Sequence, residues 1–363
     1  GQIIPPSTVM VILGEVLGAA YQQAQLARGS FTVETVSVGQ LFAGAMIPGL
    51  LLVALYVLYQ LARAWLSPAV APAIPKDELA TVDARRLLSV LVPPLVLIVA
   101  VLGSILGGIA TPTEAAAVGA VGATLLAARR QGGLAARLAP LAGLAALGLA
   151  LLGGLFDLRL GREVVPLADR LATAAAVLLV LVLAAGLLAA LLALGRAGVL
   201  GRVCESTTTI TAMIFATLIG ATLFALVFRG LGGEETVKEL LAALPGGAWG
   251  ALATVMAVMF LMGFFLDFVE ITIIVIPIVG PVLLAMGMDP IWLGVLIAIN
   301  LQTSFLTPPF GFALFYLAGV APKEVGARDL YRGIAPFVAL QLLALAIVAA
   351  FPGLATWLPR ALF

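Results

Sequence analysis

Histidine is absent from the sequence, and Cys204 is its single cysteine. Without histidine the chain cannot form a His-ligated metal site, a His general base or a His proton relay. One cysteine cannot form a disulfide within the chain, so a disulfide framework is excluded as well. The sequence also shows no nucleophile paired with a base. We therefore predict a protein that is not an enzyme, with no catalytic residues.

Charged residues are scarce. They make up 10% of the 363 residues, and the formal net charge is +1. No basic tract or aromatic-laced basic patch is present, so nucleic-acid binding is excluded. Hydrophobic residues make up 63%, and the mean hydropathy is +1.20, more than a water-soluble core of this size requires. We conclude that the lipid bilayer surrounds most of this chain.

Apolar runs of membrane-crossing length recur along the chain. Examples are 39–62, 138–156, 171–194, 206–228 and 334–351. Each run is continuously apolar, which is typical of helices and not of barrel strands with alternating residues. The sequence therefore predicts an all-α polytopic membrane protein. Because the chain opens on Gly1 with neither an initiator methionine nor a signal peptide, we expect further residues before it.

Lysine and arginine orient a membrane protein because they are retained on the cytoplasmic side. One set of loops carries 12 of them: Arg63, Lys76, Arg85, Arg86, Arg129, Arg130, Arg137, Arg196, Arg202, Lys323, Arg328 and Arg332. The other set carries 7: Arg28, Arg159, Arg162, Arg170, Arg229, Lys238 and Arg360. We therefore place the first set in the cytoplasm.

This charge distribution predicts the path of the chain. The stretch 88–128 leaves the cytoplasm and returns as two helices that meet near Thr111 to Glu114. The stretch 248–288 enters from outside and returns there, as a re-entrant hairpin with its turn between Gly263 and Asp267. The stretch 290–321 then crosses inward, and Pro308-Pro309 must interrupt it because prolines lack the backbone donor.

Two proline pairs indicate an inverted repeat. Pro5-Pro6 and Pro308-Pro309 are each followed by an apolar half-helix, and the charge distribution makes the two segments run in opposite directions. Inverted repeats with unwound helices near the bilayer midplane are the architecture of secondary transporters. The alternative is that these prolines only kink helices in a channel or scaffold protein.

Three further segments carry a resemblance to a known family. They are Gly108–Gly119 around Thr111-Pro112-Thr113-Glu114, Gly263–Asp267 leading into Ile276-Pro277, and Asn300–Gly311. With the opening Gly1–Ser7, they resemble the large subunit of tripartite ATP-independent periplasmic (TRAP) transporters. The hairpin that precedes the opening segment in the family does not occur in this sequence. Two additional Ala/Leu/Gly-rich helices lie at about 131–200, and the sequence assigns them no function.

The resemblance implies an elevator-type transporter of the bacterial inner membrane. A mobile domain of hairpins and broken helices would slide against a scaffold and carry organic acids, such as dicarboxylates, 2-oxo acids or sialic acid. Sodium ions would be the coupling ions, with no other cofactor. The implied partners are a periplasmic substrate-binding protein and a small membrane subunit. The alternative is a stand-alone ion-coupled carboxylate carrier with the same inverted-repeat fold.

We divide the chain into transport and scaffold segments on this basis. The transport domain comprises 1–20, the first-repeat broken helix, and 248–321, the second-repeat hairpin and broken helix. The remaining segments are 21–87 (scaffold helix and cytoplasmic connection), 88–130 (scaffold helix pair), 131–205 (inserted helix pair), 206–247 (scaffold helix and periplasmic amphipathic segment) and 322–363 (C-terminal scaffold helix).

The proline breaks provide candidate sodium ligands, because backbone carbonyls there lack helical partners and hydroxyls lie nearby. The predicted ligands are the carbonyls of Gly1, Ile4 and Pro6 in the first repeat, and Ser304, Thr307 and the Phe310 carbonyl in the second, with Gly263 facing them. The alternative is that water or neighbouring hydroxyls satisfy these carbonyls.

Asp267, Glu270 and Thr303 are candidates for substrate binding or other transport-domain roles. Asp267 lies in an apolar stretch, where a carboxylate is costly and suggests function. It is equally well suited to cap the next helix. Glu114 fits a capping box with Thr111, which favours a structural role. No lysine or arginine falls in the hairpin or broken helices, so helix N-termini and backbone amides near 304–311 are expected to bind the substrate carboxylate.

The acidic residues Glu234, Glu235 and Glu239, together with Lys238, predict an exposed amphipathic helix on the outer face. Such a helix is either simply solvated or contacts the binding protein.

Overall fold

A computed structural model describes residues 3–29, 34–69, 72, 83–159, 161, 166–307, 314, 317–318, 321 and 325–363. Every regular element in these ranges is a helix, and seven of the described helices are long and apolar enough to cross a membrane. This confirms the predicted all-α polytopic fold. The chain forms two compact units, one of Gly1–Thr81, Ile105–Pro112 and Met213–Phe363, the other of Val82–Ser104 and Thr113–Ala212.

Helix α12 (Pro290–Leu306) is the centre of the first unit. Every residue from Trp292 to Ser304 is buried, including the four polar residues near its C-terminal end. The helices that pack against it are α1 (Thr8–Ala27), α2 (Val38–Leu66), α10 (Gly247–Met262), α11 (Phe268–Ala285), α14 (Ala327–Ala350) and α15 (Gly353–Leu362). Gly294 permits a close approach of α1 and α2, because a Cβ there would lie only 2.7 Å from Leu41 and 2.9 Å from Leu17.

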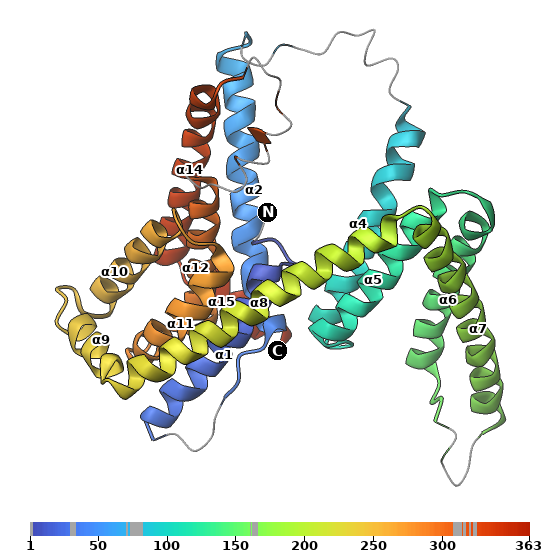
Figure 1. Ribbon diagram of the computed structural model, residues 1–363, viewed down its shortest axis with the longest axis horizontal. Helices are drawn as coiled ribbons and strands as arrows, with labels where there is room; N and C mark the ends of the chain where they lie inside the picture. The colour runs from blue at the N-terminus through green and yellow to red at the C-terminus, as the bar shows by residue number, and fades with distance from the viewer. Residues whose placement is uncertain are drawn as a thin grey trace. The chain divides into compact units, whose positions relative to one another are not determined.

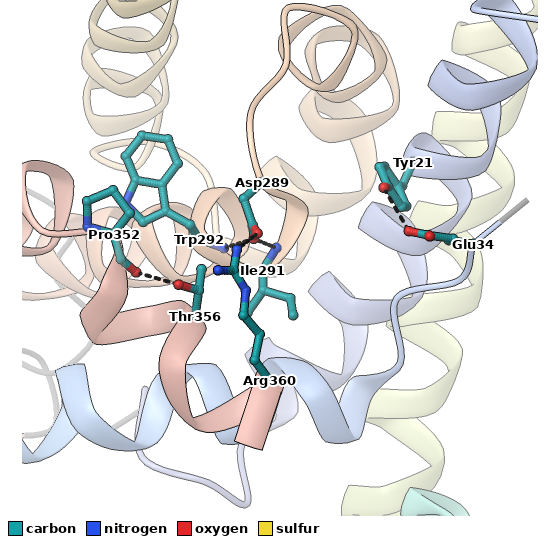
Figure 2. Close-up of polar contacts among 8 residues, drawn as sticks. All are labelled: Tyr21, Glu34, Asp289, Ile291, Trp292, Pro352, Thr356 and Arg360. Carbon is teal, nitrogen blue, oxygen red and sulfur yellow. Dashed lines mark hydrogen bonds and ion pairs between the residues drawn. The ribbon is translucent and has the colours of Figure 1, made fainter. Parts of the chain in front are cut away.

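Polar contacts hold the first turn of α12 to the C-terminal helices (Figure 2). Asp289 caps α12 by accepting the backbone N–H groups of Ile291 at 2.9 Å and Trp292 at 3.0 Å. Arg360 of α15 lies 3.4 Å from the same carboxylate. The indole Nε1 of Trp292 donates to the carbonyl of Val348 in α14 at 2.9 Å. The start of α12 is therefore fixed by side chains that are distant in sequence.

The hairpin predicted at 248–288 consists of α10 and α11, which contact each other on either side of the link 263–267. The acidic stretch is a helix, as predicted: α9 (Gly233–Ala242), which meets α10 at an angle of 119°. Glu234 of α9 pairs with Arg229 at 3.1 Å and accepts from Gln23 at 3.0 Å, so it is already engaged within this unit.

The second unit contains α4 (Ala84–Leu106), α5 (Pro112–Arg129), α6 (Gly133–Leu155) and α7 (Leu167–Arg196). Helices α6 and α7 run side by side along their length (Figure 1). Their contact is made by small residues, and a Cβ on Gly186 would overlap Ala142. Pro112 begins α5 and Glu114 lies in its first turn, where the structural interpretation of Glu114 places it.

The helix ends differ from the predicted segments at three places. Helix α1 continues beyond residue 20 to Ala27, and α8 (Val199–Gly230) begins within the stretch assigned to the inserted pair. The C-terminal segment contains two helices, since α14 ends at Ala350 and α15 begins at Gly353, after Pro352. Proline lacks the backbone donor that a continuous helix would need here.

Candidate functional site

The first proline break lies beside α12. Residues from Ile3 to Pro6 are not helical, and Ser7 caps α1 by accepting the backbone N–H of Met10 at 3.4 Å. The backbone N–H of Ile3 donates to the side-chain Oε1 of Gln302 at 3.1 Å, in a bond that joins residues 299 positions apart. Both residues are buried. This bond joins the segment that precedes α1 to α12.

The second proline break ends α12. The helix stops at Leu306, and Thr307 is extended, with φ −95° and ψ 132°. Its backbone N–H still donates to the carbonyl of Ser304 at 3.0 Å. The helix is therefore interrupted directly before the proline pair, as predicted. Pro308, Pro309 and the predicted ligand Phe310 lie outside the described residues, as does Gly1 of the first break.

Gly263 lies against Ser304. A Cβ built on Gly263 would overlap both the Cβ and the Oγ of Ser304, so only glycine leaves room for this approach. Its φ of −65° is ordinary for any residue, which makes space and not backbone conformation the reason for glycine. Asn300 adds a second link between α10 and α12, since its Nδ2 donates to the carbonyl of Met256 at 2.9 Å. The structure thus places Gly263 opposite Ser304, one of the three residues that Gly263 was predicted to face.

The hydroxyl groups near the second break each donate one turn back along α12. The bonds run from Ser304 to the Leu301 carbonyl at 2.9 Å, from Thr303 to Ile299 at 2.8 Å, and from Thr307 to Thr303 at 2.8 Å. All three acceptors are carbonyls inside α12 and not the candidate ligand carbonyls at the proline breaks. A hydroxyl that donates its hydrogen keeps two lone pairs, so each oxygen can still accept a bond or ligate a cation.

Asp267 is the N-cap of α11. Its Oδ1 accepts the backbone N–H of Phe268 at 2.7 Å, and its own N–H donates to Oε2 of Glu270 at 3.3 Å. This capping box engages both carboxylates at the start of the helix. The ring of Phe268 packs edge to face on Phe305, with centroids 6.5 Å apart, which places this helix start beside the end of α12.

The remaining candidates occupy different environments. Thr303 is fully buried, Ile4 is half-buried and Pro6 is exposed. Ile4 packs on α2, where a Cβ on Gly49 would meet its side chain at 3.1 Å. Of the predicted residues that the structure describes, Gly263 and Ser304 are in direct contact, whereas Ile4 and Pro6 are connected to them through Ile3 and α12.

The sequence analysis assigned no role to Gln302, which bonds to Ile3, or to Asn300, which bonds to Met256 of α10. A signal for both was present. They belong to the polar run Asn300 to Ser304, with Leu301 as its one apolar member, inside an otherwise apolar helix. Polar side chains in a membrane segment face protein or a water-filled cavity and are functional candidates. The run therefore marks a buried polar section of α12.

Three features meet inside this multi-pass helical protein: backbone breaks, a helical hairpin and a buried polar run. Together they define a membrane transport permease. The family model described as "Tripartite ATP-independent periplasmic transporter, DctM component" matches residues 1–199 and 168–354, and the chain belongs to this family. The resemblance seen in the sequence is thus confirmed. Members are transporters and not enzymes, and the chain is a multi-pass protein of the inner membrane.

Similar proteins include the C4-dicarboxylate TRAP transporter large permease DctM of Vibrio cholerae, 27% identical over 369 residues, which cover the whole chain and 66% of that protein. DctM of Pseudomonas aeruginosa is 28% identical over 99% of the chain and 65% of its own length. The ectoine TRAP transporter large permease TeaC of Halomonas elongata is 23% identical over 98% and 64%. The chain therefore spans about two thirds of the length of these relatives.

Proposed function

We propose that this chain is the large membrane subunit of a sodium-coupled, binding-protein-dependent importer of organic acids that works by an elevator movement. The observation that carries the proposal is the meeting of three elements on α12. The first proline break reaches it through Ile3 and Gln302, the hairpin through Gly263 and Ser304, and the second break is its own C-terminal end.

Sodium suits the chemistry of these residues. A hard cation prefers oxygen ligands, and helix breaks in transporters provide carbonyls for such ions. Here the candidates are neutral: the carbonyls of Ile4 and Pro6, outside any helix, and the hydroxyl oxygens of Ser304 and Thr307. Neutral ligands leave the positive charge of the ion uncompensated. A bound sodium ion would therefore favour an anionic substrate nearby.

A carboxylate substrate is the second part of the proposal. Between Gly247 and Thr307 there is no lysine or arginine, so a fixed side-chain cation is not available in this stretch. Backbone amides near 304–311 and the bound ion would provide the positive potential instead. Two of the relatives above have C4-dicarboxylate in their names and one has ectoine, which supports a small organic acid as substrate.

The proposed partners are a periplasmic substrate-binding protein and a small membrane subunit. The relatives' names describe large permeases of TRAP systems, which supports a multi-component transporter. The alternative function, a stand-alone ion-coupled carboxylate carrier, needs neither partner. The two functions differ in one measurable respect, which is whether uptake stops when the binding protein is left out.

Uptake by reconstituted vesicles tests the proposal. The full-length protein would be reconstituted with its proposed small subunit and binding protein, and uptake of radiolabelled succinate, a C4-dicarboxylate, would be measured. We expect uptake only with both an inward sodium gradient and the binding protein. Undiminished uptake in sodium-free buffer with a pH gradient would refute sodium coupling. Sodium-driven uptake that persists without the binding protein would favour the stand-alone carrier.

A further inference from the structure

The second unit contains a cavity of about 730 Å³ that the proposed transport cycle does not use. It lies between α4 and α5, and its wall is completed by Leu194 of α7 and Val199 of α8. This volume is within the range of roughly 300 to 1,000 Å³ that is typical of small-molecule sites. The cavity is therefore large enough for a ligand, and its lining indicates which kind.

One part of the lining is apolar and elongated. Residues of α4 from Ser89 to Ile98 line it, and at 1.5 Å per residue they span about 14 Å along the helix axis. Leu97 and Leu126 face each other's helices across this part. The slot runs along α4, a helix that is long and apolar enough to cross a membrane. An apolar slot of this length matches the upper part of a lipid acyl chain, and its apolar side chains provide no hydrogen-bond partners for a free polar metabolite.

The other part of the lining is cationic. Arg129 and Arg130, at the end of α5, contribute to the cavity together with Gln131. Both arginines are exposed, and within the described residues neither guanidinium has a carboxylate partner. Guanidinium groups at one cavity can bind a phosphate diester through charge-assisted hydrogen bonds. The charge distribution in the sequence puts both at the cytoplasmic surface, where anionic lipid headgroups are found.

One residue of the lining has a backbone carbonyl that lacks its usual helical donor. Pro93 and Pro94 lie inside α4, and Pro94 has no N–H to donate to the carbonyl of Val90, four residues earlier. Val90 lines the cavity, as both prolines do. A headgroup hydroxyl, such as that of a glycerol headgroup, could donate to an acceptor at this position, whereas a bare phosphate ion could not use the apolar slot beyond it.

We propose that this cavity binds one anionic phospholipid of the cytoplasmic leaflet. Its phosphate contacts Arg129 and Arg130, and the first part of an acyl chain occupies the slot between α4 and α5. The proposal is independent of sodium coupling and of the substrate, because it concerns a different unit of the chain and is tested without transport.

Lipid binding to the purified full-length protein tests the proposal. After delipidation in detergent, native mass spectrometry and thermal melts would compare dioleoyl-phosphatidylglycerol with dioleoyl-phosphatidylethanolamine and with glycerol 3-phosphate. We expect selective retention of phosphatidylglycerol and a higher melting temperature with it. The double variant Arg129→Gln, Arg130→Gln should bind it about 30-fold more weakly, at roughly 1 kcal/mol per arginine. The matched control Arg63→Gln, which removes a cationic side chain from α2 of the first unit, should retain parental binding.

A second pair of variants tests the slot and does not alter the charge. Ala123→Phe fills the cavity wall on α5, whereas Ala116→Phe changes an exposed residue of the same helix outside the cavity. We expect only the first to reduce phosphatidylglycerol binding. Any one of four results would overturn the proposal. These are equal binding of both phospholipids, glycerol 3-phosphate binding as strong as lipid binding, an equal loss of binding in the Arg63→Gln control, and unchanged binding in Ala123→Phe.

Discussion

Gly263→Ala is the most direct test of the contact between the hairpin and α12. The added Cβ would overlap the Cβ and Oγ of Ser304, and the Cβ is fixed to the helix backbone and cannot rotate away. Overpacking of this kind costs about 1 to 3 kcal/mol. We therefore expect a clearly lower melting temperature in detergent, and a shift of the hairpin away from α12.

A double-mutant cycle isolates this contact. Ser304→Gly removes the opposing Cβ and by itself costs about 1 kcal/mol as a glycine inside a helix. In combination with Gly263→Ala it should recover most of the overpacking cost, which gives a favourable coupling of about 1 to 3 kcal/mol. Ser304→Ala is the control, because it removes the hydroxyl but keeps the Cβ, and it should recover little.

The same variants separate packing from ion binding. If the Ser304 hydroxyl ligates sodium, the double variant should regain stability while its half-saturation for sodium in the uptake assay remains raised. A Gly263→Ala protein with parental stability would refute the close approach of the hairpin. Parental sodium dependence in Ser304→Ala would remove this hydroxyl from the proposed site.

Four further outcomes are expected. Thr307→Val keeps the side-chain volume but deletes the oxygen, so the sodium concentration for half-maximal uptake should rise severalfold while the melting temperature stays nearly unchanged. An unchanged sodium dependence with a stability loss of about 1 kcal/mol would show that the hydroxyl has only a structural role. Asp267→Ala should lose about 0.5 to 2 kcal/mol in a thermal melt, whereas Asp267→Asn retains the cap, and equal losses would contradict the capping role. Gln302→Leu leaves the buried backbone N–H of Ile3 unpaired and should lower the free energy of unfolding by about 1 to 3 kcal/mol. A parental melting temperature would refute the bond between Ile3 and Gln302. Single cysteines would also be placed at Arg130 and at Glu235 in a background without Cys204, and labelled with a membrane-impermeant thiol reagent. The cysteine at Arg130 should react only from the cytoplasm and the one at Glu235 only from the periplasm. The opposite labelling at Glu235 would overturn the predicted hairpin.

The sequence determined the class of protein, because composition and apolar run length are local properties. A membrane interior accepts only backbones whose donors and acceptors are satisfied, and long apolar runs can satisfy them only as helices. Proline acts locally too, since it removes a donor wherever it occurs in a helix interior. For this reason the end of α12 before Pro308 was predictable. The same rule does not distinguish Pro93-Pro94 from Pro308-Pro309. Helix α4 continues through the first pair, whereas α12 ends before the second.

Only the tertiary structure decided which distant groups meet. The bond from Ile3 to Gln302 joins residues 299 positions apart, and no local pattern specifies which side chain an unwound segment contacts. Gly263 was predicted to face Ser304, Thr307 and Phe310 across the proline break, but the reason for glycine there is the small space beside Ser304 of α12. Asp267 was open to two roles in the sequence, and the backbone geometry at the start of α11 makes it a cap. Burial and contact depend on the packing of whole helices, whereas helix formation and helix breaks follow from the residues themselves.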